Sequence, residues 1–474
     1  MASKSILRTM IKLISLAALV FLFSGIALPQ ATPSKKDKKQ ADTFFKDAEK
    51  SFGQRNYRNA IDQYKQSVAL VQANPQAHLK LAYSHYYLKE YDEAMAELDL
   101  ASTQGVKPID ISRLRYFLRI QKKDYSGALA DIRELLKVEP NNSEFVLAEA
   151  DINSALGDDR SALDAYQRAV AQNPSNANLY YKIAVLQAKL GNVDGQISAA
   201  EEAIKRNTQF LGDAYNIAAD GYLKQKKYDQ AEQAYNRAID RWKAAGEKKQ
   251  EIYDTYRTLG DIYRRMNRFN DAIKITKQAI IDYPGDGTLY TDISWYYSLA
   301  DRHQDAVDSA RAGIQFAPKS YLAYTNLCRA YNDTAQYALA VASCTAALRL
   351  SPDDGETYYY LGRAYDLTDK SNEATKAYDK AVKGLEKYTK ENADYSDGFY
   401  LLGNAYFADG QPQKAIAAYL KCLELSPRFI KARYNLAIIY AREKNKAAAM
   451  EQYNSLLAID ATLAAKLKTE LDKL

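Results

Sequence analysis

The stretch YYYLGRAYDLTDKSNEATKAYDKAV, residues 358–382, decides how this chain folds. Gly362 and Ala374 lie twelve residues apart, and tyrosines flank each of them at helical spacing. Small residues at two such places let two helices approach closely, while rings on either side fill the remaining space. The stretch therefore predicts an antiparallel helix pair with small residues at its contact and tyrosines around it.

The same arrangement returns along most of the chain. The position of Ala374 recurs about every thirty-four residues, with two longer intervals of forty-one. One helix pair cannot bury its apolar faces alone, but a stack of pairs can, so this period predicts a repeat array. The twelve positions, eleven of them alanine, are Ala60, Ala94, Ala128, Ala162, Gln196, Ala231, Ala272, Ala306, Ala340, Ala374, Ala415 and Ala449.

A second column lies nine residues before this alanine column and is tyrosine in the last seven repeats. Repeats three to five, residues 109–211, carry Arg119, Asn153 and Gln187 there instead. Without the ring we expect these repeats to pack more loosely or to bend differently. The seven tyrosines are Tyr222, Tyr263, Tyr297, Tyr331, Tyr365, Tyr406 and Tyr440.

The order aromatic, Leu-Gly, Tyr, Ala, aromatic, Ala and Pro resembles the tetratricopeptide repeat. The order is seen in the opening stretch and again in YLLGNAYF (400–407) with KAIAAYLKCLELSP (414–427). The resemblance covers residues 41–463 and implies an all-α, right-handed α-solenoid of about twelve stacked helix-turn-helix repeats. Two units are longer by seven residues, which predicts lengthened helix pairs, since seven residues make about two helical turns. Residues 464–474 are expected to form a C-terminal cap helix.

The N-terminal residues have the pattern of a targeting segment. A basic start leads into a mostly apolar stretch at 13–28, so residues 1–27 are expected to be a signal peptide or, uncleaved, an N-terminal anchor. Residues 28–40 are expected to be a basic linker containing KKDKK. The sequence thus predicts an exported protein, periplasmic or otherwise extracytoplasmic, with a membrane tether through 13–28 if the segment is retained.

Charge and motifs argue against several functions. The formal charge of +6 comes from the basic start and from KKDKK, so the array itself is neutral and carries no stripe for nucleic acid. No motif of a metallohydrolase, nucleophile elbow or phosphate loop occurs. His78 and His85 share one helix face, but they occupy aromatic columns and are expected in the core. We therefore predict a non-catalytic protein without cofactor or metal site.

The resemblance implies that the first helix of each repeat lines a concave groove. Groove positions in the C-terminal third combine the contact area of Tyr, the fork of donors of Arg and the paired donor and acceptor of Asn, which suits an extended peptide. A solvated face and a contact between copies remain open alternatives. The predicted groove residues are Thr325, Asn326, Arg329, Tyr359, Arg363, Tyr400, Asn404, Tyr434 and Asn435.

A second, more charged set is a weaker candidate for a binding groove, because its opposite charges could pair with one another. The set consists of Asn216, Asp220, Arg257, Asp261 and Trp295. The resemblance implies a scaffold or adaptor of the cell envelope that binds one or more proteins or peptides. The alternatives are a self-assembling structural protein and a subunit that presents substrates to a separate enzyme, and homo-oligomerisation stays open.

Two of the three cysteines fall in one repeat. Cys328 and Cys344 lie on opposite helices at equal distances from the connecting turn, so a disulfide between them is expected in an exported protein. The alternative is that both are small buried residues. Cys422 has no partner in its own repeat.

Overall fold

A computed structural model describes residues 32–246 and 248–473. The predicted signal or anchor segment therefore lies outside the described residues, and so does Leu474. Within the described residues no helix is both long and apolar enough to cross a membrane.

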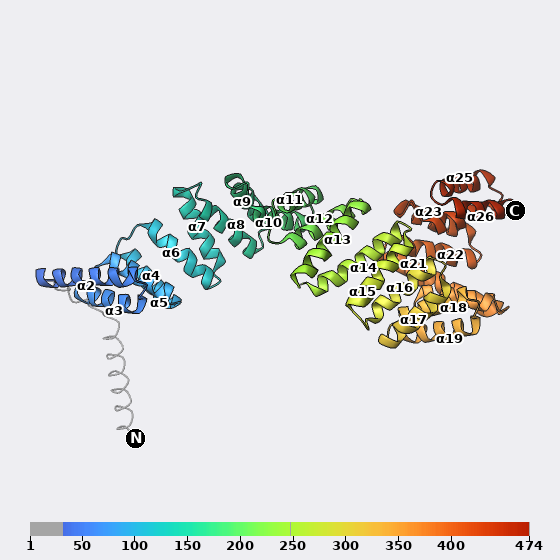
Figure 1. Ribbon diagram of the computed structural model, residues 1–474, viewed down its shortest axis with the longest axis horizontal. Coiled ribbons are helices and arrows are strands. Elements are labelled where there is room, and N and C mark those ends of the chain that lie inside the picture. Colours follow the sequence, from blue (N-terminus) through green and yellow to red (C-terminus); the bar gives the residue numbers. More distant parts are fainter. Residues whose placement is uncertain (1–31, 247, 474) are drawn as a thin grey trace, which may run out of the picture. The chain divides into compact units, whose positions relative to one another are not determined.

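The described chain is built of helices alone, 25 in number, and contains no strand. Consecutive helices pair along the chain, α2 with α3, α4 with α5 and so on to α24 with α25 (Figure 1). This gives twelve pairs followed by a single helix, which confirms the predicted all-α helical repeat solenoid.

Contact clustering divides the chain into two compact units, Met1–Ser175 and Asn176–Leu474. The boundary falls inside residues 109–211, where the sequence lacks the tyrosine column. The helices of the first unit are α2 (Lys35–Gly53), α3 (Tyr57–Leu70), α4 (Pro75–Tyr87), α5 (Tyr91–Thr103), α6 (Pro108–Gln121), α7 (Tyr125–Val138), α8 (Ser143–Leu156) and α9 (Asp159–Gln172).

The second unit continues the pairing to the C-terminal helix. Its helices are α10 (Ala177–Lys189), α11 (Val193–Lys205), α12 (Leu211–Lys224), α13 (Tyr228–Ala245), α14 (Lys249–Arg265), α15 (Phe269–Asp282), α16 (Gly287–Leu299), α17 (His303–Phe316), α18 (Tyr321–Asp333), α19 (Tyr337–Leu350), α20 (Gly355–Asp366), α21 (Ser371–Glu391), α22 (Ser396–Ala408), α23 (Pro412–Leu425), α24 (Ile430–Arg442), α25 (Lys446–Leu457) and α26 (Ala461–Leu471).

Small residues stand where the helices of a pair touch. Ala60, Ala94, Ala128 and Ala162 are fully buried, and so are their counterparts in most later repeats. At Gly362 an added Cβ would lie 2.6 Å from the Tyr378 ring, so even alanine would force the ring to move. The close approach predicted from the alanine and glycine columns is therefore present.

The turn inside each pair has one backbone conformation throughout. The residue five before the alanine column has positive φ in all twelve repeats, for example 60° at Arg55 and 57° at Ala335. Only three of the twelve are glycine, namely Gly157, Gly191 and Gly410. The stacking geometry thus imposes a left-handed turn even where the side chain disfavours it.

Two predicted boundaries are wrong. The basic stretch from Lys35 to Gln40 is the start of α2 and not a linker, because Ser34 caps the helix and forms a capping box with Asp37. The cap helix α26 begins at Ala461, three residues before the expected start, and Asp460 accepts the Leu463 amide hydrogen at its N-terminus. Leu467 of α26 is fully buried, with Leu463 and Leu471 packed beside it.

The longer units do contain longer helices, but these do not form one pair. In the first, α13 has 18 residues and α14 has 17, and they belong to neighbouring repeats on either side of the Gly246 cap. In the second, α21 alone takes up the addition, with 21 residues, while α22 keeps 13. The added turns thus lie at junctions between repeats.

Candidate functional site

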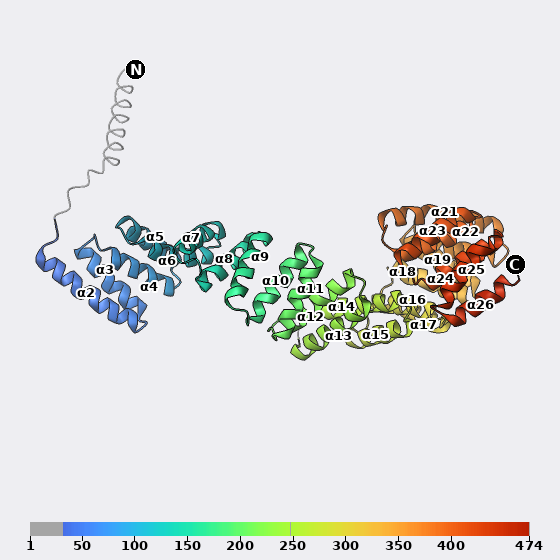
Figure 2. The same ribbon diagram turned by 90° about the horizontal axis from the view of Figure 1, so that it is seen from above.

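The first helices of the C-terminal repeats form one continuous wall. Helices α16 and α18, α18 and α20, and α20 and α22 touch directly, in addition to the contacts inside each pair. The described second helices show no comparable contact with one another. Helices that approach one another most closely lie on the inside of a curved stack, so the first helices form its inner wall. Figure 2 shows the helices of this C-terminal part from above.

The stack curves far enough for distant repeats to meet. Arg264 near the end of α14 donates to Asp397 of α22 at 2.6 Å, across 133 residues of sequence. Asn267 donates to the backbone oxygen of Arg428 at 2.7 Å. We call the Arg264–Asp397 ion pair the clasp; the sequence pattern did not indicate it.

The clasp is buried and supported on several sides. Arg264 is 5% exposed and Asp397 6%. The same guanidinium donates to Asp261 at 2.5 and 2.9 Å and lies 4.9 Å from the Trp295 ring centre. The guanidinium also lies 6.0 Å from the ring centre of Tyr395, which precedes α22. The residues after the long helix α21 thus reach back to α14.

Asn404 is buried and bonded inside the stack, contrary to the sequence prediction, whereas Asn435 is bonded to it but partly exposed. Asn404 is 9% exposed, and its Oδ1 accepts the Tyr419 hydroxyl at 2.5 Å. Asn435 donates to Asn404 at 2.9 Å and to Tyr419 at 3.3 Å. These amides are held by one another and by the ring of the second helix.

The same hydrogen bond recurs along the chain and explains the error. A tyrosine of the second helix donates to the residue fifteen earlier in Tyr64–Glu49, Tyr166–Asp151, Tyr235–Asp220 and Tyr419–Asn404. The position after the small residue, taken as groove-facing, is therefore an internal acceptor in these repeats. Asp220 of the second predicted set is bound in this way, at 2.5 Å.

Thr325, Asn326 and Arg329 of α18 are also buried, at 1%, 8% and 8% exposure. Thr325 shares a hydrogen bond of 2.6 Å with Thr357, and Asn326 donates to the Thr291 oxygen at 2.9 Å. Arg329 in turn donates to Asn326 at 2.5 Å. These side chains join neighbouring first helices, so the prediction of a groove surface here is wrong for Thr325, Asn326 and Arg329.

Arg329 also reaches a carboxylate of α20. Its Nη1 lies 3.4 Å from Glu356. Burial raises the pKa of Glu356 to about 7, while the charge of Arg329 acts in the opposite direction. This part of the inner wall is thus a buried ionic contact between two first helices.

Besides Asn435, four predicted groove residues and one residue that was not predicted are partly exposed on the inner wall. Tyr359, Arg363, Tyr400 and Tyr434 are partly exposed. Arg363, with 37% of its side chain exposed, donates to Asp333 at 2.9 Å. Lys431 of α24 is the missed residue, and burial lowers its pKa. Its place one helical turn before Asn435 was the available signal.

The charged residues of the second predicted set bind neighbouring residues and not one another. Arg257 donates to Asp292 at 2.8 Å, and Asp261 accepts from both Arg264 and Arg265. Charges at this part of the wall are therefore neutralised locally, but by residues outside the predicted set.

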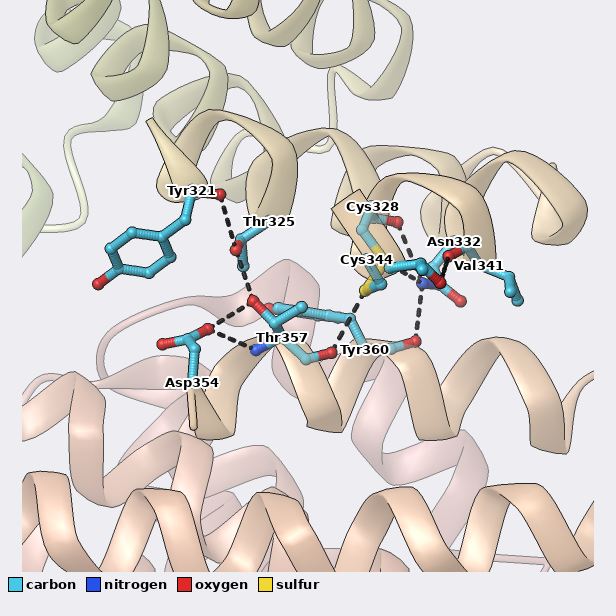
Figure 3. The surroundings of a disulfide bond; sticks show 10 residues. Tyr321, Thr325, Cys328, Asn332, Val341, Cys344, Asp354, Thr357 and Tyr360 are labelled. Carbon is cyan, nitrogen blue, oxygen red and sulfur yellow. Dashed lines mark hydrogen bonds between the residues drawn. A yellow bond between two sulfur atoms is a disulfide. The ribbon is translucent and has the colours of Figure 1, made fainter. Parts of the chain in front are cut away.

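The structure contains the disulfide expected between Cys328 and Cys344. Both residues are fully buried, one on α18 and one on α19 (Figure 3). Beside them Asn332 donates to the backbone oxygens of Cys328 and Tyr360, both at 3.1 Å. The disulfide thus lies at the contact of this hairpin with α20. Cys422 is buried, and burial raises the pKa of its thiol.

His78 and His85 each bond a carboxylate. His78 lies 2.6 Å from Glu97 and His85 2.6 Å from Glu90, and both rings are buried. The hydrogen bond with Glu97 raises the pKa of His78. No cluster of three or more metal-ligating side chains occurs in the part of the chain that the structure describes.

These features define a helical-repeat solenoid with a polar, aromatic inner wall. Family models of the tetratricopeptide repeat match five segments, at residues 51–105, 150–191, 210–280, 396–429 and 430–463. The chain is a tetratricopeptide repeat protein. Its class is that of scaffolds for protein–protein interaction.

Curated relatives are similar only over segments. A TPR repeat-containing protein of Methanocaldococcus jannaschii is 24% identical over 33% of this chain and 30% of its own length. General transcription factor 3C polypeptide 3 of Homo sapiens is 25% identical over 24% of this chain and 14% of its own. Photosystem I assembly protein Ycf3 of Prochlorococcus marinus is 28% identical over 27% of this chain and 71% of its own. The chain thus spans less than a third of the length of the first two.

Solved structures align along most of the chain at low identity. The Cut9–Hcn1 structure shows 15% identity, covers 91% of this chain and 96% of its own, and has a TM-score of 0.36. Yeast Tom70 shows 12% identity, covers 92% and 95%, and has a TM-score of 0.38.

Proposed function

We propose that this protein is a non-catalytic scaffold of the cell envelope that holds an extended segment of a partner protein on the inner wall of its C-terminal unit. The repeat family supports the scaffold role. The contact residues of the proposal are Tyr359, Arg363, Tyr400, Lys431 and Tyr434.

The observation that carries the site is a set of partly exposed Tyr and cationic side chains on a rigid base. Tyr400 packs 6.1 Å from the Tyr419 ring, and Tyr419 is fixed by Asn404. Tyr359 packs 6.2 Å from the Tyr378 ring. Rings that are already held lose little conformational entropy on binding, so they provide contact area at low cost.

The cationic residues favour a partner segment that carries acidic side chains. Arg363 keeps part of its guanidinium exposed beside Asp333. Lys431 makes no ion pair within the described residues, and its lowered pKa reflects the burial of an ammonium group. A carboxylate of the partner would offset that burial.

Two observations support an exported location. The sequence begins with a basic stretch followed by the apolar residues 13–28. The Cys328–Cys344 disulfide fits an oxidising compartment, since disulfides are rare in reducing cytosol.

The test is affinity capture from envelope extract with the full chain. We expect Tyr359→Ala, Arg363→Ala and Tyr434→Ala together to lose the partners that the parent chain retains. The matched control changes three exposed second-helix residues of nearby repeats, Lys376→Ala, Lys383→Ala and Leu420→Ala, and should retain them. Circular dichroism verifies that both variants fold. Partners recovered equally with both variants would show that the inner wall is not the binding surface.

A further inference from the structure

The N-terminal unit contains a hollow between the third and fourth repeats. Its volume is about 300 Å³. Arg133 of α7, Glu149 and Asn153 of α8, and Arg160, Asp164 and Arg168 of α9 line it.

The hollow lies where other repeats place a tyrosine. Asn153 belongs to the column that is tyrosine in repeats six to twelve. In repeat nine that ring is Tyr331, whose hydroxyl accepts from Arg311 at 2.7 and 3.1 Å. Arg133 stands five residues after Ala128, as Arg311 stands five after Ala306. At the hollow, Arg133 thus corresponds to Arg311, but Asn153 replaces the tyrosine whose hydroxyl would accept from it.

Other repeats that lack this tyrosine fill its place themselves. Arg119 donates to Asp131 and to the Gly127 oxygen, both at 2.8 Å. Gln187 reaches the helix backbone at Gly195. Asn153 has a shorter side chain, which neither spans the space nor finds a partner there.

Two side chains at the hollow make no hydrogen bond in the described structure: Asn153, which is buried, and Arg133, which is exposed and lies near Asp158. Asn153 is 2% exposed, and its Oδ1 accepts no hydrogen bond in the described structure. An unmet buried acceptor costs about 1–3 kcal/mol. Arg133 makes no hydrogen bond within the described residues, whereas Arg168 is already paired with Glu149 and Asp164.

We propose that the hollow binds the side chain of a tyrosine from a partner protein. The phenol donates its hydrogen to Asn153 Oδ1 and accepts from Arg133, as Tyr331 accepts from Arg311. The ring occupies the space that a framework tyrosine fills elsewhere and lies beside a guanidinium, which favours an aromatic face. A carboxylate would satisfy Arg133, but it has no hydrogen to give Asn153. This site lies in the first unit and is independent of the inner-wall proposal.

The test uses N-acetyl-tyrosinamide as the probe and saturation-transfer difference NMR on the full chain. We expect transfer from the protein to the tyrosine ring, and weaker transfer to N-acetyl-phenylalaninamide. Asn153→Tyr should abolish the transfer and raise Tm, because the chain's own ring then fills the hollow and accepts from Arg133. Arg133→Gln should reduce the transfer without filling the space.

Three results would overturn the proposal. They are no transfer to the tyrosine probe with the parent chain, transfer that survives Asn153→Tyr, and equal transfer to both probes. The Tyr359, Arg363 and Tyr434 triple variant serves as the control and should bind the probe like the parent chain. Failure of the inner-wall proposal would leave these results unchanged.

Discussion

At the scale of single residues, the fold depends on side chains that are small or that tolerate a left-handed turn. Gly362 and the alanine column allow close helix contact, since a larger side chain would meet a buried ring such as Tyr378. The turn position is the less obvious case. It has positive φ in every repeat, although nine of the twelve residues there are not glycine.

Ala335 is the turn residue for which this strain is simplest to measure. Its φ is 57°, and alanine has no side-chain polar group to compensate. We expect Ala335→Gly to stabilise the protein by about 1 kcal/mol, since glycine accepts this conformation without strain. Urea unfolding followed by circular dichroism measures the change.

The reverse substitution is the control. Gly410 occupies the same turn position with φ of 74°, and nothing lies within 4 Å of an added Cβ. Gly410→Ala should therefore destabilise by a similar amount through backbone strain alone. Equal stability of both variants and the parent chain would contradict the argument.

At the scale of elements, one hairpin has a covalent link. Helices α18 and α19 are joined by Cys328–Cys344 across 16 residues, next to side chains that connect α18 to α20. This hairpin contacts α20, which carries Tyr359 and Arg363 of the proposed binding surface.

We expect reduction of this disulfide to destabilise the second unit. Closing a loop of this length contributes about 3 kcal/mol by restricting the unfolded chain. A reductant should lower Tm of the parent chain. Cys328→Ala with Cys344→Ala should lower it by itself and remove the response to reductant.

Cys422→Ala is the matched control for the disulfide. Its thiol is buried and unpaired, so this variant should keep the response to reductant. A parent chain whose Tm does not respond to reductant would show that the link contributes nothing to stability.

At the scale of the whole molecule, the two compact units differ in how far their repeats reach. The second unit brings repeats that are far apart in sequence into contact through Arg264 and Asp397 and through Asn267 and Arg428. The long helices α13, α14 and α21 lie at the junctions that lead into these contacts. The long helices are thus found in the unit whose repeats contact one another over long sequence distances.

The clasp predicts a strong effect of one carboxylate. Asp397→Ala leaves Arg264 buried beside Asp261 alone, and removing one partner of a buried pair costs about 3–5 kcal/mol. We expect lower stability, together with faster amide hydrogen exchange in both α14 and α22. Mass spectrometry of exchanged peptides measures both regions separately.

An exposed aspartate provides the comparison for the clasp. Asp366 lies at the end of α20 and is exposed, so Asp366→Ala should leave exchange in α14 unchanged. If Asp397→Ala affects only α22 and leaves α14 unchanged, the clasp does not connect the two helices energetically.

The sequence by itself determined the helix pairs, their number and the small and tyrosine columns. These features depend on contacts between residues a short distance apart, which repeat with the period. It also indicated Cys328 and Cys344, because both lie in one hairpin. The inner wall was predicted only in part: Tyr359, Arg363, Tyr400 and Tyr434 are accessible, whereas Asn404 and Thr325 are internal.

Only the tertiary structure decided which polar side chains are hydrogen-bonded inside the stack and which stay accessible to a partner. Whether Asn404 of α22 is free to bind a ligand or accepts the Tyr419 hydroxyl depends on how α23 packs against α22. The clasp joins residues 133 positions apart, and the repeat period says nothing about where the curve returns. Likewise, the sequence shows Asn153 only as a substitution in the tyrosine column. The hollow beside it is seen only in the structure. Local periodicity fixes the units, and the curvature of their stack fixes the surface.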